Sequence, residues 1–456
     1  MEQERTMRLL ENAIYQADLS TVCNLDLPWE ELDGRSILIS GATGMIGSTL
    51  IDVLMMRNRS LEEACGVSAD TGRAAGQGQA EAVTVRGVNC LEDARAGKEC
   101  GVSMRGCRII ALGRSEEKAK SRFQEYWEDP RFVFVRCDIN DRESLEHGCV
   151  EAGICGLQYE TGVCRVQDEA GFTGSQGEAG VGDMKEEANA CSSQYEFGKT
   201  AADTIDYVFH AASNTHPVAY ANDPIGTVVT NIIGLDNLLH SATEHGCRRF
   251  LFASSNEIYG ENRGDTELFD EQYCGYIDCN TLRAGYPESK RAGEALCQAY
   301  IRQKGLDVVI PRFTRSFGPS LLATDTKALS QFIRKGVARE DIVLKSAGTQ
   351  FFSYTYVCDA VSGLLYCLLK GSCGEAYNIA DVNCDITLRD LAQTIADSVG
   401  TKVVFDLPDA VEAAGYSKAT KARLDSTKLQ RLGWKAQFDM KTALEHTIKV
   451  MRMLAE

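Results

Sequence analysis

The chain has 456 residues, of which 44% are hydrophobic, so it can bury a large core divided into two or three domains or subdomains. Its net charge of -17 and its pI near 5.0 argue against a nucleic-acid partner, because binding to phosphates requires a basic face. No run of 18 or more apolar residues occurs and the N-terminal stretch is charged, so we expect no membrane partner and a cytoplasmic location.

The eighteen cysteines are expected to be mostly reduced thiols in that compartment. None has the CxxC spacing of a zinc site, and a close pair such as Cys274 and Cys279 has no cluster of histidines beside it. We therefore predict no metal site and interpret the cysteines as small apolar side chains.

Six short apolar runs are predicted to be buried strands, at residues 36–40, 108–112, 132–137, 207–210, 250–254 and 308–313. Most of them lack the alternation of a half-exposed sheet, and helical patterns lie between them. This arrangement is typical of a parallel sheet that helices cover on both faces. We predict an N-terminal helical extension, a Rossmann-type doubly wound α/β domain and a smaller C-terminal α/β lobe, at residues 1–34, 35–310 and mainly 311–456.

Two segments interrupt this order, at about 61–106 and 148–203. They are rich in Gly, Ala, Ser, Cys and Glu and have weak periodicity, so we interpret them as insertions that the chemistry does not need. In the last third, Thr387 is predicted to cap a helix over "LRDLAQTIADSV" that ends at Gly400. A strand at 402–405 and a last helix at about 440–454 are expected to follow.

The stretch "SGATGMIG" places Gly41, Gly44 and Gly47 directly after the first strand and at the start of an amphipathic helix. Glycines allow a tight turn and a close approach of the backbone to a ligand, and a helix N-terminus attracts a pyrophosphate. This context predicts a dinucleotide site, with a turn that merely packs as the alternative. The residues between the glycines, Thr43, Met45 and Ile46, are expected to line the site.

The end of the second predicted strand bears on the choice of dinucleotide. Gly113 stands where a carboxylate would favour NAD, and Arg114 follows it, so a 2'-phosphate would not be repelled and NADP remains an alternative to NAD. Asp138 and Ile139, after the third strand, are predicted to flank the adenine. A simple loop cap explains Asp138 equally well.

The stretch "YPESK" holds Tyr286 and Lys290, which lie on one face of a helix because they are four residues apart. A lysine ammonium near a phenol favours the phenolate, so a tyrosine with an ordinary pKa near 10 becomes a usable base near neutral pH. A surface tyrosine beside a solvated lysine is the alternative interpretation. The dinucleotide turn upstream and the polar stretch "SSNEIYG" at the end of an apolar strand favour the catalytic one.

Taken together, these motifs resemble those of the extended short-chain dehydrogenases/reductases that act on nucleotide sugars, the NAD-dependent epimerase/dehydratase family. The resemblance also rests on "HAAS" at 210–213, "PRFTRSFGP" and "SYTYVCDA", and it runs from about residue 36 to the C-terminus without the insertions. It implies NAD as cofactor, a nucleoside-diphosphate sugar bound by the C-terminal lobe, and a homodimer formed through helices near 230–244 and 286–303.

The family's site residues can be transferred to the matching positions. The resemblance implies that Tyr286 takes the proton of the sugar 4-hydroxyl, assisted by Ser255. Lys290 lowers the tyrosine pKa and, like Tyr286, contacts the cofactor, and Glu257 acts as an acid or base on neighbouring carbons. Further contacts are implied for the cofactor at Ala211, Ala212 and Ser213, and for the substrate at Ser213, Asn256 and Arg315.

Two positions depart from the family pattern. Arg315 stands where an asparagine is common, and Phe352 stands where an arginine usually meets the diphosphate. We interpret Arg315 as a ligand of the diphosphate or of a substrate carboxylate, with a structural salt bridge as the alternative.

The resemblance predicts an enzyme that oxidises a nucleotide sugar at C4 and then decarboxylates, dehydrates or epimerises it. Many 4,6-dehydratases carry an aspartic acid where Asn256 stands, and an amide cannot donate that proton as an acid. Simple 4-epimerases often lack the glutamate at Glu257. The set therefore resembles that of UDP-glucuronate decarboxylases, although GDP-mannose dehydratases share it, and a 4,6-dehydratase or a 4-epimerase remains an alternative. An NADPH-dependent reductase and a non-catalytic NAD(P)-binding scaffold are the further alternatives.

Overall fold

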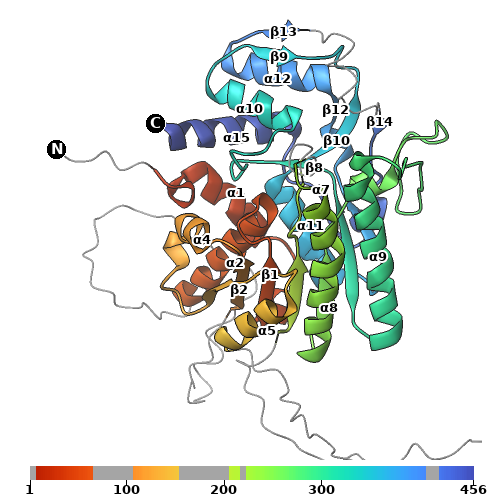
Figure 1. Ribbon diagram of the computed structural model, residues 1–456. Coiled ribbons are helices and arrows are strands. Elements are labelled where there is room, and N and C mark those ends of the chain that lie inside the picture. The colour runs from red at the N-terminus through yellow and green to blue at the C-terminus, as the bar shows by residue number, and fades with distance from the viewer. Residues whose placement is uncertain (1–6, 65–105, 154–204, 216–221, 407–420) are drawn as a thin grey trace, which may run out of the picture.

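The computed structural model describes residues 7–64, 106–153, 205–215, 222–406 and 421–456 (Figure 1). Most of the two predicted insertions lies outside these ranges. Residues 61–64 and 148–151 at their N-terminal ends belong to helices, because α2 (Met45–Ala64) and α5 (Arg142–Glu151) extend into them.

A parallel sheet forms the centre of the larger lobe, with the strand order β11-β7-β5-β4-β1-β2-β3 and with β6 paired beside β7. The strands are β1 (Ser36–Ser40), β2 (Arg108–Gly113), β3 (Phe132–Arg136), β4 (Tyr207–His210), β5 (Arg249–Phe252), β6 (Ser254–Ser255), β7 (Val308–Phe313) and β11 (Ala376–Ile379). All six predicted strands are present. One was predicted as a single run at 250–254, but its pairing with β7 is interrupted at Ala253, because β7 carries Pro311 there and proline has no N–H to donate. The Ala253 carbonyl accepts a hydrogen bond from Lys290 Nζ.

Helices cover both faces of this sheet, as its uninterrupted apolar strands predict. Ile37 and Ile39 pack with α1 (Ala13–Cys23), α2 and α11 (Val357–Lys370), whereas Leu38 between them packs into a second core with α8 (Leu235–Glu244) and α9 (Gly285–Lys304). The predicted doubly wound α/β fold is therefore confirmed. The remaining helical elements of this lobe are α4 (Glu116–Arg122), α7 (Pro224–Val229), the π-helical turn η6 (Thr230–Gly234) and the short turns η1 (Leu9–Glu11), η2 (Trp29–Leu32), η4 (Gln124–Tyr126), η7 (Asn256–Tyr259) and η8 (Leu282–Ala284).

The smaller lobe lies over the carboxyl ends of the strands, at the top of Figure 1. Its strands pair as β12-β10-β14, with β8 beside β10, and as β13-β9. Its elements are β8 (Arg315–Phe317), α10 (Ala328–Val337), β9 (Ile342–Leu344), β10 (Phe351–Tyr356), η9 (Val382–Cys384), β12 (Asp385–Thr387), α12 (Leu388–Val399), β13 (Val403–Phe405), β14 (Lys421–Ala422), α14 (Thr427–Gln430) and α15 (Met440–Ala455). Thr387 caps α12 and Gly400 ends it with φ +75°, as predicted from those two residues.

The two lobes are connected by segments that cross from one lobe to the other and by contacts of the N-terminal helix. Although most of the sequence after residue 310 forms the smaller lobe, β11 and α11 lie in the larger one. In the N-terminal helix α1, the buried Asp18 accepts a hydrogen bond from Tyr356 at 2.6 Å, and His446 Nδ1 on α15 lies 2.9 Å from the same carboxylate. No helix in the described ranges is both long and apolar enough to span a membrane.

Candidate active site

The glycine turn between β1 and α2 is packed so closely that side chains would not fit. Gly41 has φ +72°, and a Cβ there would lie 2.7 Å from the backbone nitrogen of Ala212. A Cβ on Gly47, in the first turn of α2, would lie 2.6 Å from the carbonyl oxygen of Gly41. The turn thus presents bare backbone at the N-terminus of a long helix, which is suited to a pyrophosphate.

The residues predicted to contact an adenosine follow β2 and β3, the two strands on one side of β1. Arg114 follows β2 as an exposed side chain, and the next residue, Ser115, caps α4 by accepting a hydrogen bond from Lys118 N. After β3, Asp138 Oδ1 accepts a hydrogen bond from Asn140 N at 3.0 Å, so Asp138 closes its own turn in the way of a loop cap. Ile139 beside it is buried.

A buried histidine at the end of β4 fixes the wall of the cleft. His210 Nδ1 lies 2.7 Å from Ser40 Oγ, and its ring stacks on Phe252. Burial, with a smaller effect of the Lys290 charge, holds the His210 pKa well below its usual range, so the ring is neutral near pH 7. Ser40 in turn binds the backbone of Ala211 and Ala212, which orients the predicted cofactor contacts.

Helix α9 carries the predicted base and its lysine. Tyr286 is 7% exposed, and Lys290, one turn later, is buried. The Lys290 ammonium donates a hydrogen bond to the carbonyl of Ala253 at 2.8 Å and lies 4.7 Å from the centre of the Phe252 ring. Burial lowers the pKa of Lys290 to about 7, although Cys297 and Glu294 act in the opposite direction.

The strand tip β6 and the turn η7 bring the other predicted catalytic residues beside α9. Ser255 is buried, and its hydroxyl accepts a hydrogen bond from Glu257 N at 3.2 Å. The Glu257 side chain is 30% exposed, and its Oε2 lies 3.9 Å from Arg283 Nη2. Sequence reasoning missed Arg283, although its place one helical turn before Tyr286 was a usable signal.

The two positions that depart from the family pattern touch each other. The Arg315 guanidinium lies 3.8 Å from the centre of the Phe352 ring, because β8 and β10 are paired neighbours in the smaller lobe. Its Nη1 is buried and has no hydrogen-bond partner within the described ranges. No salt bridge of Arg315 is found there either, so the structural alternative considered for this residue has no support.

One cleft of about 1650 Å³ between the lobes brings all the predicted site residues together. This volume exceeds that of a site for one small ligand and leaves room for a dinucleotide beside a nucleotide sugar. The described part of the chain holds no group of three or more His, Cys, Asp or Glu side chains arranged for a metal ion. The predicted residues that line the cleft are Gly41, Thr43, Gly44, Met45, Ile46, Gly47, Arg114, Asp138, Ile139, Ala211, Ala212, Ser213, Ser255, Asn256, Glu257, Tyr286, Lys290 and Arg315.

Comparisons of the sequence identify related proteins. A model of the NAD dependent epimerase/dehydratase family matches residues 186–380. UDP-glucuronic acid decarboxylase 1 of Xenopus tropicalis is 30% identical over 248 residues, which cover 54% of this chain and 57% of that protein. UDP-glucuronic acid decarboxylase 5 of Arabidopsis thaliana is 30% identical over 245 residues, which cover 53% of this chain and 68% of that protein. The match therefore spans little more than half to two thirds of these relatives.

Solved structures share the fold. A UDP-glucose 4-epimerase of Thermotoga maritima, solved with UDP-glucose, has a TM-score of 0.63 and 18% identity over 92% of this chain and 100% of that one. A double mutant of a dTDP-glucose 4,6-dehydratase of Streptomyces venezuelae, solved with NAD, has a TM-score of 0.59 and 20% identity over 91% of this chain and 96% of that one. At these identities the likeness concerns the fold.

Proposed function

This chain belongs to the NAD-dependent epimerase/dehydratase family, and we propose that it uses NAD to oxidise UDP-glucuronate at C4 and then decarboxylates it. The arrangement of Tyr286 and Lys290 on α9 beside Ser255 and Glu257 carries this proposal, because it gathers a base and an acid/base group at one edge of the cleft. The related UDP-glucuronic acid decarboxylases and the amide at Asn256 favour decarboxylation over dehydration.

The cleft fits a dinucleotide. The glycine turn would hold the pyrophosphate, since Gly41, Gly44 and Gly47 line the cleft without side chains at the N-terminus of α2. Arg114, Asp138 and Ile139 would surround the adenosine, and Ala211 to Ser213 with Tyr286 and Lys290 would meet the nicotinamide half. When bound, NAD supplies an acceptor for the C4 hydride and later returns it.

The side chains then divide the proton chemistry. We propose that Tyr286 accepts the proton of the 4-hydroxyl while Ser255 holds that oxygen by a hydrogen bond. A charged Lys290 favours the tyrosinate, and its lowered pKa shows that burial opposes this charge in the ligand-free protein. With a ketone at C4, the C6 carboxylate belongs to a β-keto acid and leaves as carbon dioxide, and C5 takes a proton that Glu257 supplies.

Arg315 is proposed to bind an anionic part of the substrate, either the diphosphate or the uronate carboxylate. Its buried Nη1 lacks a partner among the described residues, and the ring of Phe352 holds the guanidinium plane at the cleft. A bidentate arginine suits either anion. Ser213 and Asn256 would line the sugar side of the same cleft.

The product of UDP-glucuronate and NAD tests the function. We expect carbon dioxide and a UDP-pentose, detected by mass spectrometry, with no net change in NAD. A 4-epimer with an unchanged carbon count would identify an epimerase instead. A keto-deoxy sugar from a nucleotide hexose would identify a 4,6-dehydratase. Net consumption of NADPH would identify a reductase. The absence of any product with all these substrates would favour a scaffold.

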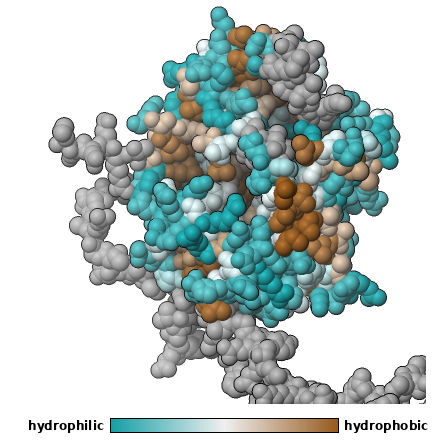
Figure 2. All heavy atoms as spheres, in the orientation of Figure 1, coloured by the Kyte–Doolittle hydropathy of each residue, from teal (hydrophilic) through white to brown (hydrophobic). Residues whose placement is uncertain are grey.

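We also propose a homodimer formed through the helices around η6 and α9. Figure 2 shows an apolar patch on the face where α7 and α8 lie in Figure 1. Ile225, Val228 and Ile233 of α7 and η6 are 77%, 37% and 47% exposed, and a contiguous exposed apolar patch is typical of an association surface. A cytoplasmic location remains a proposal that the free thiols of the described cysteines support.

A further inference from the structure

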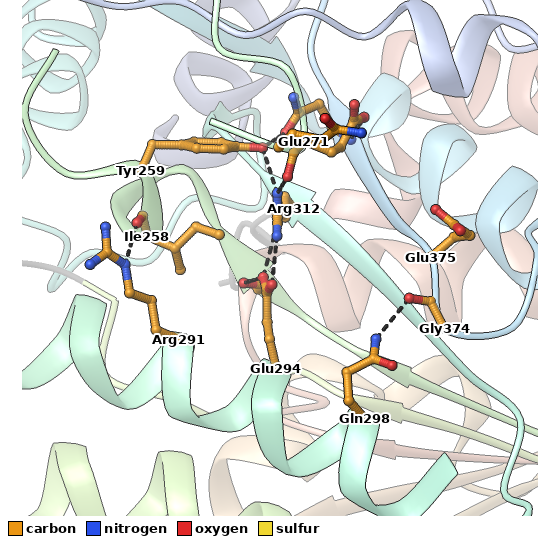
Figure 3. Close-up of polar contacts among 12 residues, drawn as sticks. Ile258, Tyr259, Glu271, Arg291, Glu294, Gln298, Arg312, Gly374 and Glu375 are labelled. Atoms are coloured by element: carbon orange, nitrogen blue, oxygen red, sulfur yellow. Dashed lines mark hydrogen bonds and ion pairs between the residues drawn. The ribbon is translucent and has the colours of Figure 1, made fainter. Parts of the chain in front are cut away.

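Helix α9 does more than carry Tyr286, because three of its side chains also hold the segment formed by Ala253, β6 and the turn η7. Lys290 binds the carbonyl of Ala253, and Glu294 Oε1 accepts a hydrogen bond from Ser254 Oγ at 2.6 Å. Arg291 Nε donates a hydrogen bond to the carbonyl of Ile258 at 2.7 Å (Figure 3). These contacts fall immediately before Ser255 and immediately after Glu257, so one helix brackets the predicted catalytic segment.

The anchor before Ser255 is rigid. Glu294 forms a two-pronged ion pair with Arg312, with distances of 2.9 Å to Nε and 2.6 Å to Nη2 (Figure 3). Arg312 Nη1 donates further hydrogen bonds to Tyr259 Oη and to the carbonyl of Glu271. Both charged side chains are largely buried, at 15% and 9% exposure, so the pair has little freedom to move.

The anchor after Glu257 is built differently. Arg291 reaches two backbone carbonyls from separate segments, that of Ile258 and, through Nη2 at 2.9 Å, that of Gly275. Gly275 is itself packed against η7, since its nitrogen donates to the carbonyl of Tyr259. Arg291 therefore fastens the C-terminal side of the turn that presents Glu257.

We propose that Glu294 and Arg291 are positioning residues for different halves of the reaction, an inference that rests on the proposed function. Glu294, through Ser254, sets Ser255 for proton removal from the 4-hydroxyl. Arg291, through Ile258, sets Glu257 for the step after oxidation. In the first half the hydroxyl proton goes to Tyr286 and the C4 hydride to NAD. In the second, the C5–C6 bond breaks, its electrons remain at C5 as an enolate, and carbon dioxide leaves. C5 then takes a proton from Glu257, and the hydride returns to C4 while Tyr286 gives its proton back to the C4 oxygen.

The test separates the two anchors. Arg291→Met removes both carbonyl contacts, and Ser254→Ala removes the contact to Glu294 while leaving the ion pair with Arg312 intact. Glu294→Gln is less useful, because it leaves the buried Arg312 without its charged partner and endangers folding. Gln298→Ala is the matched control, since Gln298 lies on the same helix and donates at 2.8 Å to the carbonyl of Gly374, which does not line the cleft (Figure 3).

The first readout needs no ligand. Hydrogen exchange of the free protein should become faster at Gly260 and Glu261 in Arg291→Met. The amides of these two residues donate hydrogen bonds to carbonyls of η7 and of the loop that contains Gly275, which are the two segments that Arg291 holds. Gln298→Ala should leave these amides unchanged. Unchanged exchange in Arg291→Met would refute the anchor, whatever the substrate of the enzyme is.

The second readout is a rapid-mixing experiment with NAD and UDP-glucuronate. In Arg291→Met we expect carbon dioxide release to fall by about tenfold to a hundredfold while reduced cofactor forms at nearly the normal rate and accumulates. Ser254→Ala should instead slow formation of the reduced cofactor. Arg291→Lys, which can reach one of the two carbonyls, should release carbon dioxide faster than Arg291→Met does. Equal slowing of both halves in both variants would overturn the division of roles. If wild-type protein releases no carbon dioxide, the proposed function fails, and hydrogen exchange still decides the anchor.

Discussion

Replacing Lys290 with methionine is expected to stabilise the ligand-free protein at low pH while it abolishes turnover. Lys290 is buried against Phe252, with one hydrogen bond to Ala253. Methionine has a similar length and no charge, so it can occupy the same space without the cost of burying an ammonium group. The gain in stability of the methionine variant should be largest before any cofactor binds.

The pKa of Lys290 sets the size and the pH window of this effect. Burial lowers it from its ordinary value of 10.5 to about 7. A change of one pKa unit corresponds to about 1.4 kcal/mol, so the penalty of the charged form is on the order of a few kcal/mol. Because the folded pKa is the lower one, the unfolded chain binds more protons between pH 7 and 10.5, and wild-type stability rises with pH through that window. The advantage of the methionine variant is full below pH 7 and is lost as the pH approaches 10.5.

The assay is urea denaturation of both proteins, freed of cofactor, at pH 6 and pH 9.5. Lys304→Met is the matched control, since Lys304 ends the same helix as an exposed side chain and should show no such pH dependence. The other titratable groups that act on Lys290 are Glu294 and Cys297 on α9, and His210 on β4 senses its charge; all three remain in the variant. A stability difference that is absent at pH 6, or equal at both pH values, would refute the reasoning.

Three further changes test the site and the assembly. Tyr286→Phe removes the proton acceptor and should lower turnover by roughly a hundredfold or more with unchanged circular dichroism, and near-normal turnover would contradict the assignment. Gly41→Ala should abolish NAD binding in calorimetry, because its Cβ would lie 2.7 Å from Ala212 N, whereas Gly34→Ala, with a similar φ of +68° and open space around it, should bind normally. Ile225→Glu should yield a monomer in sedimentation, since it puts a charge on the exposed apolar face of α7. An intact dimer would show that this face is not the dimer interface.

The parts of the fold that local patterns encode could be predicted from the sequence. The strand at 36–40 was predictable because all five residues are buried, so no polar face interrupts the apolar run. The helix after Thr387 was predictable because its cap and the left-handed Gly400 are both local devices. The glycine turn and the pair Tyr286 and Lys290 were predictable for a similar reason. In each case the spacing of the residues in the sequence is enough to bring the members of the motif together.

Contacts between distant segments could not be predicted in this way. Asp18 and His446 meet although 428 positions separate them, and neither lies in a recognisable motif. The break at Ala253 was also missed, because it arises from Pro311 on the neighbouring strand β7, and the local sequence does not tell which strands are neighbours. Both cases depend on which distant segments lie side by side, so no local periodicity reports them.

The two departures from the family pattern, Arg315 and Phe352, could be predicted from the sequence only in part. The sequence shows one cation lost and another gained, which suggests a relocated anion site but leaves open whether the two positions are neighbours. The parallel pairing of β8 with β10 makes them neighbours, and the ring lies 3.8 Å from the guanidinium. An aromatic face can hold a guanidinium in place without using its donors, since the attraction comes from the ring electrons. Phe352 therefore supports Arg315 without occupying its hydrogen-bond donors, which a carboxylate at position 352 would occupy.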